Sequence, residues 1–86
     1  MYWEDVGFLK ASHNRLAIFI ELSKGEKTPG ELRDSLQLHF SQISLILGEL
    51  VDRELIVCEN LGSRKGKMYG LTEKGKSIID TLGKVS

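Results

Sequence analysis

The most constraining feature of the sequence is a well-marked helix start at Thr28. Pro29 follows at the first helical position, and Glu31 stands three residues after the threonine. Threonine and glutamate at this spacing form a capping box, and proline is favoured at the first position because the N–H that it lacks would have no partner there. Leu32 and Leu36 are four residues apart and share a face. The pattern predicts a short helix that ends near residues 36–37.

A second helix is predicted directly after the first, beginning within residues 39–41 and running to about residue 54. At 100° per residue its apolar side chains fall within about 60° of one another. These side chains are Ile43, Ile46, Leu47 and Leu50. The opposite side carries Ser41, Leu45, Gly48 and Asp52, with Gln42 and Ser44 beside them. We therefore expect a helix that packs through one stripe and leaves its other side free for a partner.

Two more helices are predicted, one on each side of this pair. The first covers residues 12–23 and ends at Lys24 and Gly25, where glycine can adopt a positive φ. Its expected buried face consists of Leu16, Phe19, Ile20 and Ser23. Residues 6–10 are expected to add a leading turn. The last helix covers residues 72–85, starts at the cap residue Thr72 and has an apolar stripe made of Ile78, Ile79, Leu82 and Val85.

Between these helices the sequence changes to a β pattern. Residues 55–59 are apolar and β-branched, which is typical of a strand. Residues 60–66 are rich in turn formers, and residues 67–71 alternate with Tyr69 and Leu71 on one face. We expect a hairpin over about residues 55–71, with Arg64, Lys65 and Lys67 at its tip.

The order of elements is helix, helix, helix, hairpin, helix, which is the layout of a winged helix-turn-helix, a mainly α fold with a small β-hairpin (α+β). We expect one domain over residues 1–86 with its core in 9–82. In this layout the second helix of the turn projects from the body and its outer side can enter a major groove. The hairpin, or wing, projects beside it and can lie along the flanking DNA backbone or the minor groove.

Charge is balanced overall but not along the chain. Twelve basic and twelve acidic residues give no net charge. Residues 1–56 hold six basic and nine acidic side chains, whereas residues 57–86 hold six basic and three acidic ones. The basic excess therefore falls on the wing and the last helix. A solvated loop is the simpler interpretation of such a basic run, but its place beside an exposed helix favours phosphate contact.

Several classes of function lack their signals. With 86 residues, the chain has little room for a catalytic pocket. It shows no paired-carboxylate, nucleophile–histidine, phosphate-loop or metal motif, so we expect neither an enzyme nor a cofactor. Its one cysteine, Cys58, excludes an internal disulfide and is expected to be a small buried residue rather than a sensor. No apolar run reaches the roughly 20 residues of a membrane helix, and a reducing cytoplasm is expected.

The residues also resemble archaeal and bacterial winged-helix transcriptional regulators of the ArsR/MarR-like group. The resemblance covers about residues 9–82. It is carried by Arg15-Leu16-Ala17-Ile18, Thr28-Pro29-x-Glu31-Leu32, Ser41-x-Ile43-Ser44-x-x-Leu47-x-Glu49-Leu50, Leu55-Ile56 and Tyr69-x-Leu71-Thr72-x-x-Gly75. It implies a homodimer that binds operator DNA.

The sequence departs from the family pattern around the helix expected over about residues 39–54, which is the third in chain order. Gln37 and Glu54 stand where such regulators often have glycines, before that helix and before the first strand. Leu45 and Gly48 stand where a basic residue is common, and Glu49 and Asp52 are acidic. The departures indicate that DNA affinity would come mainly from the wing and the helix ends.

The candidate DNA-contacting residues lie at the ends of helices, on the outer side of the third helix and in the wing. They are Thr28, His39, Ser41, Gln42, Ser44, Leu45, Arg64, Lys65 and Lys67. Gln42 can pair with adenine, and the serines can reach a base or a phosphate, although small polar residues also simply solvate a helix. Leu45 fits a thymine methyl group, a protein contact, or a lone exposed leucine without a role about equally well. Thr28 fits helix capping at least as well as phosphate binding.

Two expectations about assembly follow. The leading hypothesis is a sequence-specific, homodimeric, DNA-binding regulator. The apolar ends of the chain would supply the dimer contact through Trp3, Phe8, Ile78, Ile79 and Leu82. The alternative is a winged-helix module that binds protein instead of DNA, which Leu45, Gly48 and the acidic residues motivate.

Overall fold

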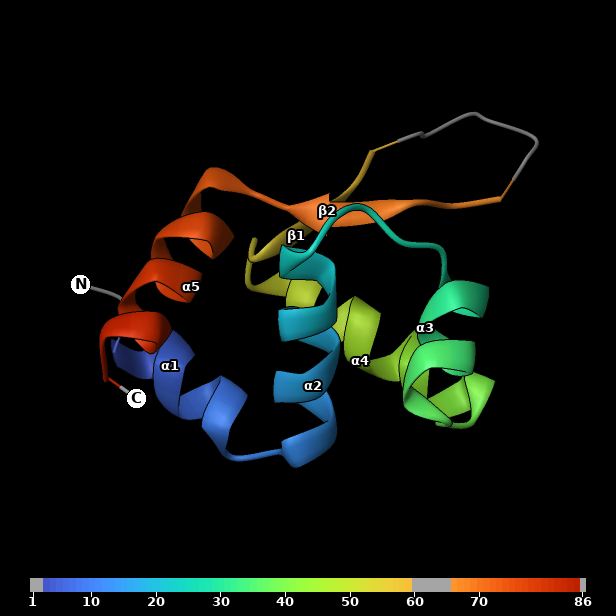
Figure 1. Cartoon of the computed structure of the whole chain (residues 1–86), viewed down its shortest axis with the longest axis horizontal. Coiled ribbons are helices and arrows are strands. Elements are labelled where there is room, and N and C mark those ends of the chain that lie inside the picture. The colour runs from blue at the N-terminus through green and yellow to red at the C-terminus, as the bar shows by residue number, and fades with distance from the viewer. Residues whose placement is uncertain (1–2, 60–65, 86) are drawn as a thin grey trace.

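The computed structural model describes residues 3–59 and 66–85 and shows a winged helix of five helices and a two-stranded hairpin. The helices are α1 (Trp3–Lys10), α2 (His13–Ser23), α3 (Pro29–Leu36), α4 (Phe40–Asp52) and α5 (Glu73–Val85), and the strands are β1 (Ile56–Cys58) and β2 (Tyr69–Leu71). Figure 1 shows α1 and α5 at one end of the molecule, α3 and α4 at the other, and α2 between them. The predicted fold class is confirmed.

The local signals around α3 act as expected. Thr28 Oγ1 accepts a hydrogen bond from the Glu31 N–H at 3.1 Å, and Glu31 Oε1 accepts one from the Thr28 N–H at 2.9 Å. This reciprocal pair closes the capping box. The helix ends at Leu36, followed by Gln37 with φ 58° and ψ 37°. Beyond the C-terminal end of α4, Glu54 also has a positive φ of 61°. The two positions where the family often has glycine are therefore both left-handed.

The core forms where the apolar stripes of the helices meet. Ile43, Ile46, Leu47 and Leu50 of α4 are all buried, as the spacing predicts. They join a cluster that also contains Val6, Leu9, Ile18, Phe19, Leu22, Leu32, Leu55, Ile56 and Ile78. The core therefore draws on every helix and on β1, and α4 contributes the largest share of it.

The expected buried face of α2 is wrong in part. The structure buries Ile18, Phe19 and Leu22, whereas Ile20 is 41% exposed and Ser23 lies at the surface. The helix packs against α1, α3, α4, α5 and β2 at once. Strand β2 and α5 both pack on α2, and Leu22 lies beside Gly70 and Leu71 of β2, whereas Leu16 is only partly buried against the core. The leading turn is also longer than expected, because α1 is a full helix packed on α2 and α5.

The wing is attached to the segment before α3 as well as being paired within its own hairpin. β1 and β2 pair antiparallel, with Val57 opposite Gly70. On the other side of β2, the Lys27 N–H donates to the Tyr69 carbonyl at 3.0 Å, and the Tyr69 N–H donates to the Lys27 carbonyl at 2.8 Å. This bridge ties the base of the wing to the segment just before α3. The wing and the helix-turn-helix are thus held as one unit.

The junction of the wing and α5 requires glycine. A Cβ atom at Gly75 would lie 2.3 Å from the Leu55 carbonyl oxygen, which is backbone and cannot move aside. The Thr72 hydroxyl caps the helix here: it accepts from the Gly75 N–H at 3.0 Å and donates to the Glu54 carbonyl at 2.6 Å. Thr72 is the expected cap residue, and it also links α5 to the end of α4.

Candidate nucleic-acid interface

The outer face of α4 is open to solvent along its whole length. We define this face as Ser41, Leu45, Gly48 and Asp52, with Gln42 and Ser44 on its flanks; all six residues are exposed. Leu45 is 67% exposed, whereas Leu47 on the opposite side of the same helix is 3% exposed. The side of α4 opposite its apolar stripe therefore faces solvent, as the sequence pattern predicts.

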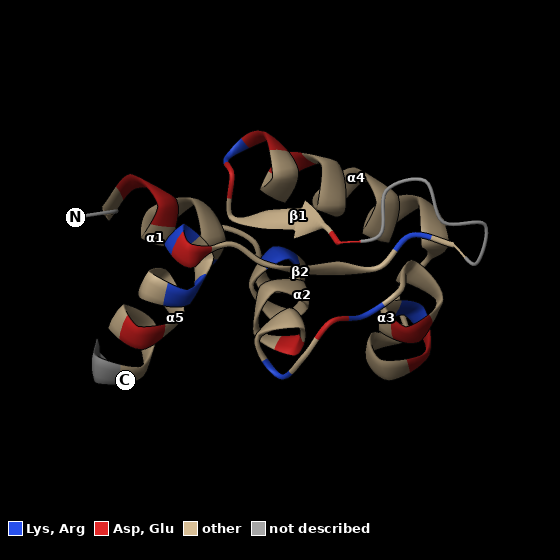
Figure 2. Ribbon diagram, turned by 90° about the horizontal axis from the view of Figure 1, so that it is seen from above, with Lys and Arg blue, Asp and Glu red and all other residues tan. Residues whose placement is uncertain are grey.

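Charge is absent from most of this helix. Residues 40–48 contain no acidic or basic side chain, and Figure 2 shows the corresponding stretch of α4 without red or blue. The carboxylates come later: Glu49 is turned toward Arg15, and Asp52 lies in the last turn. The N-terminal half of the outer face is therefore neutral, with hydroxyl groups around one aliphatic side chain.

One candidate residue, Gln42, is partly engaged in capping the start of α4. His39 is the N-cap residue, and its N–H donates to Gln42 Oε1 at 3.3 Å. The side-chain oxygen of Gln42 thus takes part in capping, and its amide nitrogen is the group left to donate outward. A bidentate contact with adenine needs both atoms, so Gln42 must share or release the cap bond to make one.

The base of the wing lies beside α4. Ser44 of α4 and Lys67 of the wing line one shared groove of about 200 Å³, together with Pro29, Phe40, Leu47 and Tyr69. Lys67 is exposed. Arg64 and Lys65, the other two expected wing contacts, lie outside the described residues. The structure thus brings one predicted wing cation next to one predicted residue of α4.

Thr28 immediately precedes Pro29, which lines this groove, and it is engaged in the capping box described above. The hydrogen bond from its backbone N–H lowers the pKa of the Glu31 carboxyl, and the Thr28 hydroxyl and the charge of Lys27 act in the same direction. An ionised carboxylate therefore already occupies the N-terminus of α3. This arrangement favours the capping interpretation of Thr28 over phosphate binding.

A cluster that sequence reasoning missed holds the other side of α4. We call it the arginine clamp: Asp5, Phe8, Arg15, Glu49 and Arg53. The guanidinium carbons of Arg15 and Arg53 lie 3.8 and 3.9 Å from the centroid of the Phe8 ring, which places the two groups on opposite sides of the ring. Its members come from α1, α2 and the end of α4, so no local spacing signals it.

Each arginine of the clamp is neutralised. Arg15 donates to the Phe8 carbonyl at 2.5 Å and to Glu49 Oε2 at 3.3 Å. Arg53, the C-cap residue of α4, donates to Asp5 Oδ1 at 3.0 Å, and Lys74 approaches Asp5 Oδ2 at 3.2 Å. Asp5 is only 8% exposed. The clamp therefore fixes the C-terminal half of α4 to α1 and α2.

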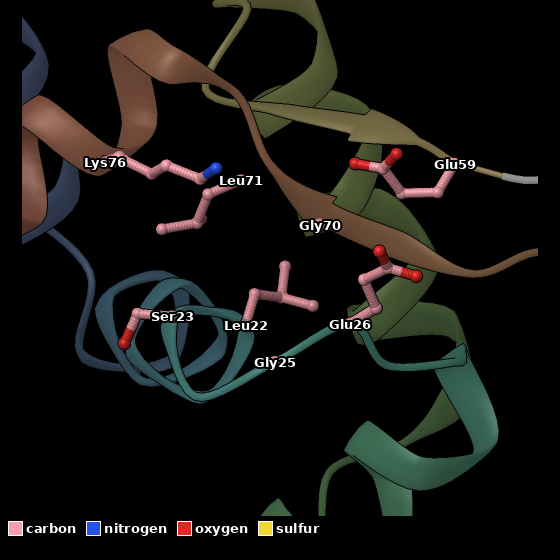
Figure 3. A pocket seen from close by; sticks show the side chains of 8 residues that line it. All are labelled: Leu22, Ser23, Gly25, Glu26, Glu59, Gly70, Leu71 and Lys76. Atoms are coloured by element: carbon pink, nitrogen blue, oxygen red, sulfur yellow. The ribbon is translucent and has the colours of Figure 1, made fainter.

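The back of the wing presents a different surface. A pocket of about 180 Å³ lies between the end of α2 and β2, and Figure 3 shows Glu26 and Glu59 on either side of Gly70 there. A Cβ atom at Gly70 would lie 3.0 Å from Glu59 Oε1 and 3.2 Å from Glu26 Cγ. The two carboxylates repel phosphate, so this side is not part of the candidate interface.

Two features are absent from residues 3–59 and 66–85, a metal-binding cluster and a membrane-spanning helix. No group of three histidine, cysteine, aspartate or glutamate side chains in these ranges is arranged to hold a metal ion. No helix in this part of the chain has the length and apolar character needed to cross a membrane.

The same architecture is found in solved structures of other proteins. Reduced HlyU from Vibrio cholerae is 28% identical with a TM-score of 0.76, over 94% of this chain and 86% of HlyU. The transcriptional regulator YodB from B. subtilis, in its reduced form, is 23% identical with a TM-score of 0.81, over 95% of this chain and 82% of YodB. NMB1585, a MarR family regulator from Neisseria meningitidis, is 21% identical with a TM-score of 0.76, over 95% of this chain and 59% of that one.

The likeness to a MarR family regulator confirms the ArsR/MarR-like resemblance at the level of the fold. No curated protein sequence matches the chain. The family model described as "Winged helix-turn-helix" matches residues 15–86, from the arginine of the clamp through the helix-turn-helix and the wing to the last residue. The chain therefore belongs to the winged helix-turn-helix family.

Proposed function

We propose that this protein is a DNA-binding transcriptional regulator that inserts α4 into the major groove and rests its wing on the flanking backbone or minor groove. The observation that carries the proposal is the exposed, uncharged N-terminal half of α4 with Lys67 beside it in one groove. The shared fold of YodB, a transcriptional regulator, and of NMB1585, a MarR family regulator, supports it.

The dimensions of α4 fit this role. Its 13 residues extend about 20 Å, and a helix with side chains is about 10–12 Å across. The major groove of B-form DNA is about 12 Å wide. The N-terminal half would face the bases, because recognition helices contact base edges through their first turns. Asp52 then lies at the far end, where it keeps the C-terminal turn away from phosphates.

The proposed contacts divide by chemistry. Ser41, Gln42, Ser44 and Leu45 face the bases, whereas His39 and Lys67 face phosphates at the rim. Arg64 and Lys65 are proposed as further backbone contacts from their sequence alone. Thr28 remains at the edge of the surface, where its hydroxyl can donate to a phosphate oxygen while it accepts the cap bond.

We further propose that the active form is a homodimer joined through α1 and α5. Trp3 is 57% exposed on α1, and Ile79 and Leu82 are half-buried on α5. Two of the expected interface residues are corrected: Ile78 is 1% exposed and belongs to the monomer core, and Phe8 is held in the arginine clamp. The contact would therefore centre on Trp3, Ile79 and Leu82.

Selection of bound sequences from a random pool of double-stranded DNA at moderate salt tests the function. We expect an enriched inverted repeat with half-sites about one helical turn apart. Lys67→Gln should weaken binding to all sequences alike and reduce the slope of log affinity against log salt by about one phosphate contact. Lys24→Gln is the matched control, because Lys24 is an exposed lysine between Ser23 and Gly25, which line the pocket outside the candidate interface. Equal behaviour of the two variants contradicts the placement of the wing.

The second candidate function is a protein-binding module. The observation that favours it is the absence of any basic residue in α4 before its C-cap, Arg53. A folded protein that enriches no sequence and shows no salt-sensitive DNA binding would support this alternative and contradict the first proposal.

A further inference from the structure

The aliphatic side chain of Leu45 stands alone on the outer face of α4. In a helix its nearest surface neighbours are the residues three and four positions away. On the N-terminal side these are Ser41 and Gln42, and on the C-terminal side Gly48 and Glu49. Leu45 is 67% exposed, and none of the four neighbours is aliphatic. The surface is therefore a single apolar knob surrounded by polar or very small groups.

This pattern differs from that of a protein-binding anchor. Anchors of protein interfaces lie in contiguous apolar patches that exclude water around them. The other exposed apolar residues of α4 are Phe40 and Val51, and neither shares the side of Leu45: they lie five and six positions away, more than 100° around the helix. An isolated leucine among hydroxyl, amide and glycine neighbours instead matches the major-groove edge of DNA, where a thymine methyl is the one apolar group among donors and acceptors.

The surroundings of the knob also fit DNA. Residues 40–48 carry no carboxylate, and the neighbouring carboxylate of Glu49 is paired with Arg15 at 3.3 Å, which reduces its repulsion of phosphates. Gly48 leaves open space, with no atom within 4 Å of where its Cβ would lie. Two of the four neighbours, Ser41 and Gly48, are small, and Leu45 is 67% exposed. Lys67 stands at the adjacent rim, in the groove that Ser44 also lines.

We infer that Leu45 is a specificity-determining residue that reads the 5-methyl group of thymine, so that sequence preference rests on apolar contact rather than on a basic side chain. The inference rests on the proposed function, because it requires α4 to lie in the major groove. It assigns to this chain a preference for thymine at one position of each half-site. The methyl groups of Leu45 would contact the thymine methyl group with no water between them. Such a contact is favourable in proportion to the apolar area removed from water.

Replacement of thymine by uracil provides a direct test, since the two bases differ only by this methyl group. The probe is the duplex enriched from the random pool, prepared with each thymine replaced in turn by uracil. We expect one position in each half-site where the change weakens binding about fourfold, which corresponds to ~0.8 kcal/mol for one buried carbon group at 1.4 kcal/mol per factor of ten. Other positions should change little.

Leu45→Ala links that loss to this side chain. We expect the variant to bind the thymine and uracil duplexes equally, while Val51→Ala, which trims another exposed aliphatic side chain of α4, keeps the fourfold difference. A thymine–uracil difference that persists in Leu45→Ala, or that is absent at every position in the native protein, overturns the inference and leaves DNA binding intact. If the folded protein binds no duplex at all, the proposed function itself fails, and the inference fails with it.

Discussion

The two sides of α4 are held in opposite ways. Toward the body, the arginine clamp surrounds its C-terminal half with ion pairs, hydrogen bonds and a stacked ring drawn from α1 and α2. Toward solvent, the outer face has small hydroxyl groups, a glycine and an exposed leucine. The clamped side contributes to stability and orientation, whereas the outer face is free to vary without cost to the fold. The comparison separates residues that place the helix from residues that read a partner.

Among the clamp and surface residues, the largest expected effect concerns Arg15, whose side chain is only 15% exposed. Arg15→Ala removes the bond to the Phe8 carbonyl, the pair with Glu49 and one stacked guanidinium together. We expect the free energy of unfolding to fall by about 2–4 kcal/mol, because the half-buried Glu49 loses its partner. Urea denaturation measures this change.

Arg33→Ala is the matched control for Arg15. Arg33 is 53% exposed and its ion pair is with the adjacent Asp34 at 3.5 Å. Exposed pairs of this kind contribute little, so the change should stay within about 0.5 kcal/mol. Arg15→Lys should recover only part of the loss, since an ammonium cannot both stack on a ring and donate in two directions. Equal losses for Arg15 and Arg33 would show that the clamp does not hold α4.

The next largest effect on stability concerns Glu54 and Gln37, the two left-handed residues that flank α4. Glu54 follows the helix with φ 61°, a conformation that costs a side-chain-bearing residue about 1–2 kcal/mol. Glu54→Gly should raise the free energy of unfolding by about 0.5–1 kcal/mol, after the greater flexibility of glycine in the unfolded chain is allowed for. Gln37→Gly should act in the same direction. Ser35→Gly, within helix α3, should instead lower stability by about 0.5 kcal/mol.

These positions also show what sequence reasoning can reach. The two left-handed residues were noticeable as departures from a family pattern, and the capping box and the α4 stripe were predictable because their signals are local. The clamp was not, since Asp5, Arg15 and Arg53 are far apart in sequence and only tertiary packing joins them. The buried side of α2 was misassigned for a related reason: five neighbouring elements, rather than its own periodicity, decide which side is covered.

The candidate site divides in the same way. Exposure of the outer face followed from helical periodicity alone, because side chains opposite a buried stripe must face outward. The engagement of Gln42 with the His39 N–H was not foreseen, although glutamine at the third helical position is a capping signal. The juxtaposition of Ser44 and Lys67 depended on the wing's attachment to Lys27, a bridge between single residues that no sequence pattern marks.

A smaller, pH-dependent effect is expected at the start of α3. The pKa of Glu31 is lowered in the folded state by the hydrogen bond from the Thr28 N–H. Its stabilising contribution is therefore present above the unfolded-state pKa of about 4.3 and is lost as the pH falls through the lower folded-state value. Glu31→Gln keeps a capping oxygen without the charge. The difference in unfolding free energy between native protein and variant should thus vanish in acid, whereas Ser77→Ala, an exposed change on α5 that removes no titratable group, should give no such trend.

The smallest expected effect on stability concerns Leu45, and it is the sharpest test of the contrast between the two sides. Leu45→Ala should change the free energy of unfolding by no more than about 0.5 kcal/mol, because the side chain is already in water. Leu47→Ala, two residues further along the same helix, should cost about 2–5 kcal/mol, because Leu47 is 3% exposed and its loss leaves a cavity. Measured side by side in urea, the pair isolates burial from residue type and helix position. If Leu45→Ala were as destabilising as Leu47→Ala, the outer face would be part of the packed structure, and a residue needed for packing could not be assigned to reading a base.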